Sequence, residues 1–296
     1  MLKVATHSGT FHADDVFAFA ILNIATGGQV ELLRTRDSSL LEKAEVVFDV
    51  GGSLSPENGR YDHHMRDKPL RASGEPYSSA GLIWKSYGEA VVAQIFPDAT
   101  REATLRIASR MDCGLIRDVD LMDNGAMNST SGHISSLIEA FNPTFAENDR
   151  EENAAFLQAA ELAKDVLARV AARANAAILA ESTVAMAAQA SEDPRLLILD
   201  SRVPWEDAVF DLDLTELLYV IRPAGDAWTC NAVPPERGSF AQRRALPDAW
   251  GGLRDLALAA LTAVEDATFC HSGLFVCGAR SRQGALKLAH LALAGS

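Results

Sequence analysis

The first strand, the first loop and the start of the first helix are predicted in the segment Lys3-Val4-Ala5-Thr6-His7-Ser8-Gly9-Thr10-Phe11-His12-Ala13-Asp14-Asp15. Lys3 to Thr6 is apolar enough for a short strand, and a loop rich in histidine and aspartate follows it. From Asp14 to Ala25, apolar residues recur at the spacing of one helix face. Strand, loop and helix in this order predict the start of an α/β domain.

The same alternation continues outward from this stretch. Two further strands are predicted at 29–35 and 44–50, and a helix follows Ser78 or Ser79. Strands that alternate with helices predict an open parallel sheet in residues 1–144. Residues 145–181 contain neither glycine nor proline, which predicts one long helix that links two domains. In residues 182–296, short strands (one of them at 268–276) and helices predict a smaller α/β domain.

Composition narrows the class of protein. The chain has 296 residues, 48% of them hydrophobic, and a net charge of −13. No segment is long and apolar enough to span a bilayer, and no signal or transit peptide precedes the first strand, so we expect a cytoplasmic protein. Four cysteines form no CxxC pair and are expected to be free thiols. The negative charge disfavours a protein that grips long duplexes through their phosphates, but not one that takes a strand end or a small phosphorylated molecule.

Histidine and aspartate gather in three segments that each follow a predicted strand. These segments are Thr6–Asp15, Asp49-Val50-Gly51-Gly52 and Asp62-His63-His64. Ligands of open α/β sheets bind beyond the carboxyl ends of the strands, and imidazole with carboxylate suits Mn, Fe or Zn. Polar loops with a buried histidine are the alternative, but repeated charges at buried strand ends favour metal. The pattern predicts a two-metal hydrolase.

Other acids leave choices open. Asp120 and Asp123 lie three residues apart in a fourth acidic run, on one face if that run is helical. Either could supply a last ligand. Asp15 and Asp118 are interpreted either as further ligands or as solvated acids of a first helical turn.

The order of the motifs resembles one family over nearly the whole chain. The motifs are HADD (12–15), DVGG (49–52), RYDHHM (60–65), SSAGLIW (78–84), DLMDNG (120–125), VPW (203–205), GSF (238–240), LPDAWGGLR (246–254) and HSGLF (271–275). They are similar to those of the Myg-type (melanocyte proliferating gene) family of DHH-superfamily phosphoesterases. The resemblance implies a DHH-type N-terminal catalytic domain with an open parallel sheet and a C-terminal substrate-binding domain.

The resemblance also implies a set of ligands for two divalent ions. One ion is expected at His7, His12 and Asp49, with Asp49 shared, and the other at Asp14, His63 and one of Asp120 and Asp123. His64 is expected to contact substrate phosphate, and Asp62 to orient a histidine or complete a ligand shell. Mn²⁺ is the first expectation, with Mg²⁺, Fe²⁺ and Zn²⁺ as alternatives. The chain has His12 where other members of the superfamily carry an aspartate.

Substrate recognition is expected in the C-terminal domain. Its loops carry arginines that are able to hold phosphate in a bidentate manner, although each could also be a solvated surface charge. The segments 270–273 and 278–281 resemble the substrate loop of the superfamily. The predicted substrate-binding residues are therefore Arg243, Arg244, His271, Gly278 and Arg280, together with His64.

The resemblance implies a metal-dependent phosphodiesterase that activates water with two ions. By the resemblance, the first expectation is a 3′–5′ exonuclease acting on RNA or short oligonucleotides. A hydrolase of a small phosphate ester or of pyrophosphate is the alternative, and a non-catalytic regulator that binds metal or nucleotide is the second alternative. We expect no membrane partner. The alanine-rich face of the long helix is also suited to pack against a second copy of the chain.

Overall fold

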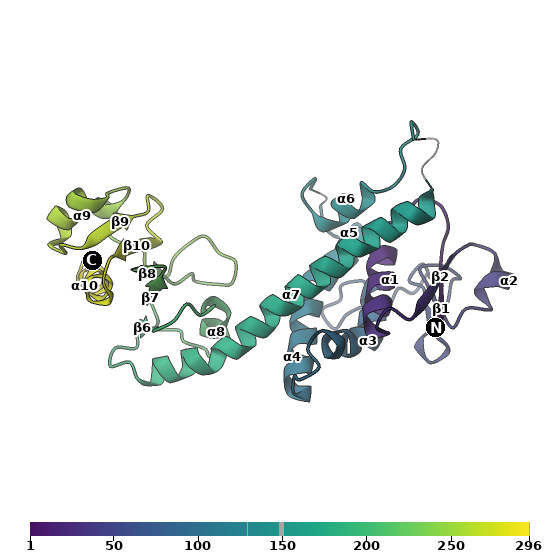
Figure 1. The fold of residues 1–296 in the computed structure, drawn as a ribbon, viewed down its shortest axis with the longest axis horizontal. Coiled ribbons are helices and arrows are strands. Elements are labelled where there is room, and N and C mark those ends of the chain that lie inside the picture. The colour runs from purple at the N-terminus through teal and green to yellow at the C-terminus, as the bar shows by residue number, and fades with distance from the viewer. Residues whose placement is uncertain (129, 148–150, 296) are drawn as a thin grey trace. The chain divides into compact units, whose positions relative to one another are not determined.

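The structure is a computed structural model that describes residues 1–128, 130–147 and 151–295. The chain forms two compact units, Met1–Asn175 and Ala176–Ser296 (Figure 1). The boundary falls inside the longest helix, α7 (Glu152–Gln189). The three-part division at residues 144 and 181 stays a prediction. The long helix starts later than residue 145, because Thr144 to Glu147 form a turn, and residues 148–150 lie outside the described part.

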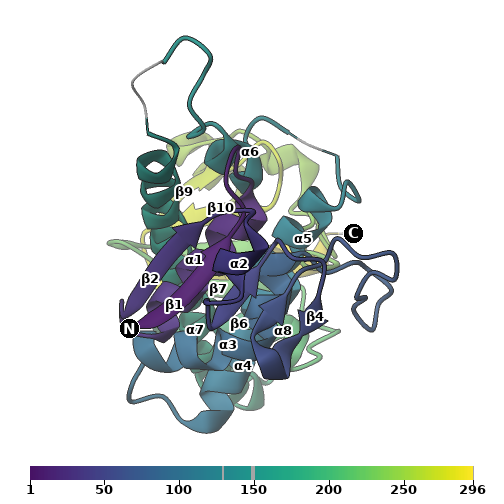
Figure 2. The ribbon, with the colours of Figure 1, turned by 90° about the vertical axis from the view of Figure 1, so that its right-hand side faces the viewer.

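Unit 1 is built on a five-stranded sheet. Its strands, in spatial order, are β2 (Val30–Arg34), β1 (Leu2–Thr6), β3 (Val46–Phe48), β5 (Arg60–Tyr61) and β4 (Leu54–Ser55). The first four run parallel, and β4 pairs antiparallel with β5 at the edge. β1 and β2 run side by side in Figure 2. All three residues of β3 are buried, as in a sheet covered on both faces.

Unit 1 also contains a set of α-helices. They are α1 (Ala13–Ala25), α2 (Ser38–Leu41), α3 (Ser79–Ile95), α4 (Arg101–Met111), α5 (Arg117–Asp123) and α6 (Ile134–Glu139). α1 packs against α3, and its residues from Ala13 to Leu22 are all buried. Two of those buried residues are aspartates, so the helix carries carboxylates into the core.

The first turns of α7 complete the core of unit 1. Phe156 is fully buried, and its ring lies edge-on to Phe11 at 5.5 Å between centroids and 5.7 Å from Phe19. The guanidinium carbon of Arg34 lies 4.8 Å from the centre of the Phe156 ring. The predicted linking helix therefore starts as part of the first unit.

Unit 2 contains a second five-stranded sheet of order β6-β7-β8-β10-β9. Its elements are β6 (Leu196–Ile198), α8 (Glu206–Asp211), β7 (Tyr219–Ala224), β8 (Ala227–Ala232), α9 (Asp255–Thr262), β9 (Ala267–Cys270), β10 (Val276–Ala279) and α10 (Arg282–Ala294). β6 and β7 are parallel and the other pairs are antiparallel. The predicted strand at 268–276 is wrong: the chain reverses there, and His271 N donates to Val276 O at 2.9 Å.

Both units combine strands with helices, so the predicted α/β class is confirmed. Across the described residues, none of the helices joins the length and the apolar character that a bilayer span requires. Cys230, Cys270 and Cys277 are buried and Cys113 is exposed, all four as free thiols.

Candidate metal centre

The parallel strands of unit 1 end at one edge of the sheet, and the histidine and aspartate segments begin there. His7 follows β1, Asp49 follows β3, and Asp62 and His63 follow β5. All four are buried, with exposed fractions of 2–4%. Asp49 holds a left-handed backbone with φ of 56°, which is uncommon for a residue other than glycine. Such strain persists where the surroundings enforce it, often at functional sites.

Asp49 lies between two histidines. Its Oδ2 is 3.1 Å from Nε2 of His7, and its Oδ1 is 3.2 Å from Nε2 of His63. One carboxylate therefore offers a different oxygen to each histidine, which is the arrangement that a ligand shared by two ions requires.

Each histidine also meets an aspartate of α1. Nε2 of His7 lies 3.3 Å from Asp15 Oδ2, and Nε2 of His63 lies 3.6 Å from Asp14 Oδ2. Because Asp14 and Asp15 are neighbours in the first helical turn, one helix start supplies a carboxylate to both sides of Asp49.

Asp123 belongs to this cluster and Asp120 does not. Asp123 Oδ2 lies 3.4 Å from His63 Nε2. Asp120 instead accepts hydrogen bonds from Ser78 N at 3.0 Å, Ser78 Oγ at 2.7 Å and Gly81 N at 3.0 Å, and it pairs with Arg71 at 2.5 Å. The geometry thus favours Asp123 in the choice that the sequence left open.

His12 is exposed at the edge of the cluster. Its nearest potential ligand atom lies within 4.8 Å of those of Asp14 and Asp123, and these three form a possible metal-binding group. The other two groups that meet the same limit are His7 with Asp15 and Asp49, and Asp49 with His63 and His64. The structure thus groups His12 with Asp14 rather than with His7 as predicted, and its role as a ligand stays a prediction.

Asp62 holds the loops around the cluster. Its Oδ2 accepts from Gly52 N at 2.5 Å, and its Oδ1 accepts from His64 N at 3.0 Å and lies 2.9 Å from His64 Nδ1. The His64 side chain is 62% exposed. It lines a pocket of about 230 Å³ together with His7, His12, Arg36, Asp49, Val50, Gly51 and Asp62.

Two contacts fix the loop between His7 and His12. Asn142 closes a pair of hydrogen bonds with Phe11, whose N donates at 3.0 Å and whose O accepts at 2.8 Å. Arg34 is buried and donates from Nη2 to Gly9 O at 2.5 Å. These hydrogen bonds fix the backbone between His7 and His12 at Gly9 and Phe11.

The electrostatics of the cluster call for positive charge. Burial raises the pKa of Asp15 to about 7 and that of Asp14 well above its ordinary value, and the charge of Asp49 adds to both rises. Burial also acts to raise the pKa of Asp49, but hydrogen bonds with His63 and His7 outweigh it and lower that pKa. Like charges buried together are costly unless cations compensate them.

Several buried atoms of the cluster lack hydrogen-bond partners. Within the described chain, Asp14 Oδ1, Asp15 Oδ2 and His63 Nδ1 are buried and form no hydrogen bond. Buried polar atoms are nearly always paired, so such atoms indicate an ion or other group that completes the site. Carboxylate oxygens and imidazole nitrogens are donors that Mn²⁺, Fe²⁺ and Zn²⁺ accept. The residues therefore fit divalent metal ions.

The predicted substrate residues of unit 2 occupy different settings. Arg243 donates to the carbonyl oxygens of Leu214 at 2.6 Å and Thr215 at 3.0 Å, so its side chain braces a turn. Arg244 donates to Gly295 O at 3.0 Å, while His271 and Arg280 are exposed.

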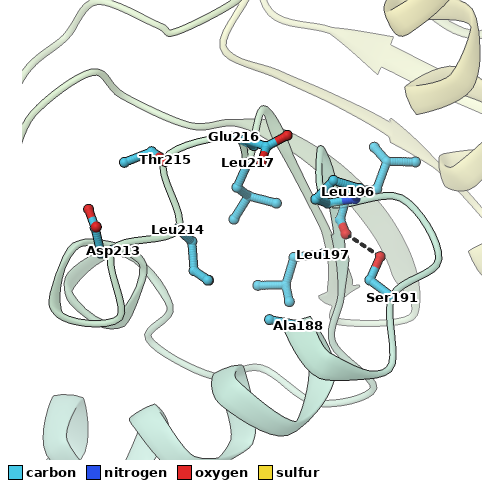
Figure 3. A pocket seen from close by; sticks show the side chains of 10 residues that line it. Ala188, Ser191, Leu196, Leu197, Asp213, Leu214, Thr215, Glu216 and Leu217 are labelled. Carbon is cyan, nitrogen blue, oxygen red and sulfur yellow. Dashed lines mark hydrogen bonds between the residues drawn. The ribbon is translucent and has the colours of Figure 1, made fainter.

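Gly278 is buried, and a Cβ there would meet Phe269 at 2.6 Å, so packing alone accounts for this glycine. A pocket of about 170 Å³ in unit 2 contains none of the predicted residues (Figure 3). There the Ser191 hydroxyl donates to Leu196 O at 2.7 Å. The role of the five predicted residues of unit 2 in substrate binding stays a prediction.

A protein-family model matches residues 3–293 of this chain. It is the MYG1_exonuc model, described as "Uncharacterised protein family (UPF0160)". The chain belongs to the MYG1 family. The family predicted from the order of the motifs is therefore confirmed.

Relatives within the MYG1 family match over nearly all of this chain. The MYG1 exonucleases of Bos taurus and Homo sapiens are each 30% identical, in matches that cover 99% of this chain and 84% and 86% of theirs. Among solved structures, RecJ of Thermus thermophilus in complex with Mn²⁺ is 16% identical, with a TM-score of 0.30. That match covers 99% of this chain, which spans 52% of the RecJ chain.

Two residues near the candidate site, Arg71 and Arg36, were not predicted from the sequence, and a third, Asp15, was not resolved between two interpretations. Asp15 was left open, and the structure buries it beside His7. Arg71 was not considered, because nothing in its loop marks it as buried against Asp120. Arg36 lines the pocket. Arg36 could have been predicted as a site residue, because it directly follows the strand predicted at 29–35.

Proposed function

We propose that this protein is a metal-dependent phosphodiesterase, acting as a 3′–5′ exonuclease on RNA or short oligonucleotides. The observation that carries the proposal is Asp49, which offers one carboxylate oxygen to His7 and the other to His63, inside a buried cluster where Asp14 Oδ1 and Asp15 Oδ2 form no hydrogen bond. The relatives that bear the name MYG1 exonuclease support the exonuclease assignment.

Two divalent ions, with Mn²⁺ as the first candidate, complete the proposed site. His7, Asp15 and Asp49 would hold one ion, and Asp14, Asp49, His63 and Asp123 the other, with His12 at its edge. Such a pair of ions supplies a nucleophile from water at neutral pH and neutralises charge on phosphoryl oxygens.

The remaining residues position the site and the substrate. Asp62 holds the backbone and ring of His64, and the exposed side chain of His64 would donate to a phosphate oxygen. Asp62 thus acts on orientation, since its oxygens are already engaged by Gly52 N and His64. Arg244, His271 and Arg280 of unit 2 are proposed as contacts for the rest of the substrate.

A hydrolase of a small phosphate ester or pyrophosphate is a second candidate. The net charge of −13 favours it, because long nucleic acid is repelled by an acidic surface. The pocket of about 230 Å³ beside the cluster is also of a size for a small ligand.

The two candidates separate in one assay. Purified protein with Mn²⁺ is offered single-stranded RNA labelled at its 5′ end, the same RNA labelled at its 3′ end, a dinucleotide and pyrophosphate. Stepwise shortening of the 5′-labelled strand supports the 3′–5′ exonuclease, whereas immediate release of labelled mononucleotide from the 5′ end contradicts that direction. Pyrophosphate cleavage without shortening supports the second candidate. Tight metal retention with no turnover of any substrate contradicts both and leaves a metal-binding regulator.

A further inference from the structure

The pocket beside the metal centre contains one permanently charged cation. Of the residues that line it, Asp49 and Asp62 are acids, and only Arg36 is a lysine or arginine. Its guanidinium group is exposed, and it forms no ion pair or hydrogen bond with the described part of the chain. An arginine that faces a cluster of acids without pairing with them is available to an incoming anion.

The neighbouring arginine shows the opposite behaviour. Arg34, two residues earlier, is 8% exposed and is used inside the protein by Gly9 and by the rings of Phe11 and Phe156. Arg34 belongs to β2, and Arg36 follows the end of that strand, at the edge where ligands of parallel sheets bind. Arg34 therefore serves the fold, whereas Arg36 has no hydrogen-bond or ion-pair partner among the residues that the structure describes.

The backbone on both sides of Arg36 is fixed. Thr35 N donates to Thr6 O at 2.8 Å, which ties this segment to the end of β1. Asp37 N donates to Thr35 Oγ1 at 3.1 Å, and Asp37 Oδ1 accepts from Ser39 N at 2.8 Å at the start of α2. The backbone around Arg36 is therefore already ordered, and its side chain lines the pocket. Binding of an anion would then cost little additional backbone entropy.

We propose that Arg36 binds a non-bridging phosphate oxygen of the substrate at the metal centre. The guanidinium fork matches two phosphate oxygens at once, which an ammonium group does not. His64 lines the same pocket and would contact the same phosphate. The inference rests on the proposed phosphodiesterase function and adds a substrate-binding residue from unit 1 to it.

The test compares Arg36→Ala and Arg36→Lys with Arg101→Ala, an exposed arginine at the start of α4 that does not line the pocket. Bound Mn²⁺ is measured first, and inorganic phosphate is then titrated into the Mn²⁺-loaded proteins by calorimetry. Arg36→Ala is expected to keep its Mn²⁺ and to bind phosphate about tenfold or more weakly, as for the loss of charge-assisted hydrogen bonds. Arg36→Lys should fall between, and Arg101→Ala should match the wild type.

The rate of substrate turnover is the second measurement. We expect kcat/KM of Arg36→Ala to fall roughly 10²-fold, the range seen when one donor to a developing charge is removed, and ethylguanidinium in solution to restore part of it. Unchanged phosphate affinity in Arg36→Ala would overturn the inference, as would loss of Mn²⁺ from that variant. If the wild type hydrolyses none of the substrates, the proposed function fails, while the phosphate titration still decides the role of Arg36.

Discussion

Asp49 is the residue through which the two sides of the metal centre meet. We predict that Asp49→Ala lowers turnover by more than about 10²-fold. Mutation of a residue that only hydrogen-bonds to a metal ligand already lowers metal affinity or activity roughly 10–100-fold. The variant should stay folded, since it removes one of several like charges that repel each other without metal. Activity, bound Mn²⁺ and thermal unfolding without metal are the measurements. Asp118→Ala, a change at a partly exposed acid of α5, is the matched control, and near-normal turnover of Asp49→Ala would disprove the shared-ligand assignment.

Asp120 and Asp123 should respond in opposite ways. Asp120 is fully buried and compensates Arg71, so Asp120→Ala leaves a buried cation with less partner charge and should destabilise the fold by about 3–5 kcal/mol. Asp123→Ala should change stability without metal little and should weaken Mn²⁺ binding. Urea unfolding and a metal titration of each variant test this. A stable Asp120→Ala that loses Mn²⁺ would reverse the two assignments.

At the scale of elements, the carboxylate of Asp120 accepts hydrogen bonds from the backbone at the start of α3. Ser78 N and Gly81 N donate to it, and Ser79 N donates to Asp14 Oδ2 at 3.3 Å. The first turn of this helix therefore supports the metal centre from one side. A negative charge at a helix start is favourable, because the helix dipole is positive there.

Gly81 gives a sharp test of that contact. Alanine normally stabilises a helix interior by about 1 kcal/mol relative to glycine. At this position, however, a Cβ would lie 2.2 Å from Asp120 Oδ2, so we predict that Gly81→Ala destabilises the protein. Gly114→Ala, where nothing lies within 4 Å, is the control. Chemical unfolding of both variants measures the effect, and a stabilised Gly81→Ala would contradict the packing of α3 on Asp120.

The elements also show where sequence reasoning succeeds. The strand end after Thr6 was predictable because the apolar run stops at a polar segment, whereas the third strand was predicted to run to Val50 and ends at Phe48. Both ends bring His7 and Asp49 together. The reversal at 271–275 was missed because its flanks, Phe269 and Phe275, continue an apolar pattern through Ser272-Gly273. The choice between Asp120 and Asp123 depended on Arg71, and a contact 49 residues apart along the chain leaves no local pattern.

At the scale of the whole molecule, the metal centre lies within unit 1 alone. We predict that Mn²⁺ at about 100 times its dissociation constant stabilises the fold of this unit by about 2.7 kcal/mol. Hydrogen exchange should slow in α1, α3 and β3, and should stay unchanged in β7, β8 and β10 of unit 2. Mg²⁺ and a metal-free sample with chelator are the comparisons. Equal protection of both units on adding Mn²⁺ would show that metal binding is not confined to unit 1.

The contact of Phe156 with Phe11 and Arg34 has a consequence for the order in which the protein matures. A chain emerges from the ribosome N-terminus first, and its early parts begin to fold while later ones are still being made. His7 to His63 are synthesised long before Phe156, yet Phe156 closes the wall behind the loop of His7 and His12. The packed wall behind this loop is therefore complete only after the first turns of α7 have left the ribosome, so we expect stable metal loading to follow the synthesis of the helix that also enters unit 2.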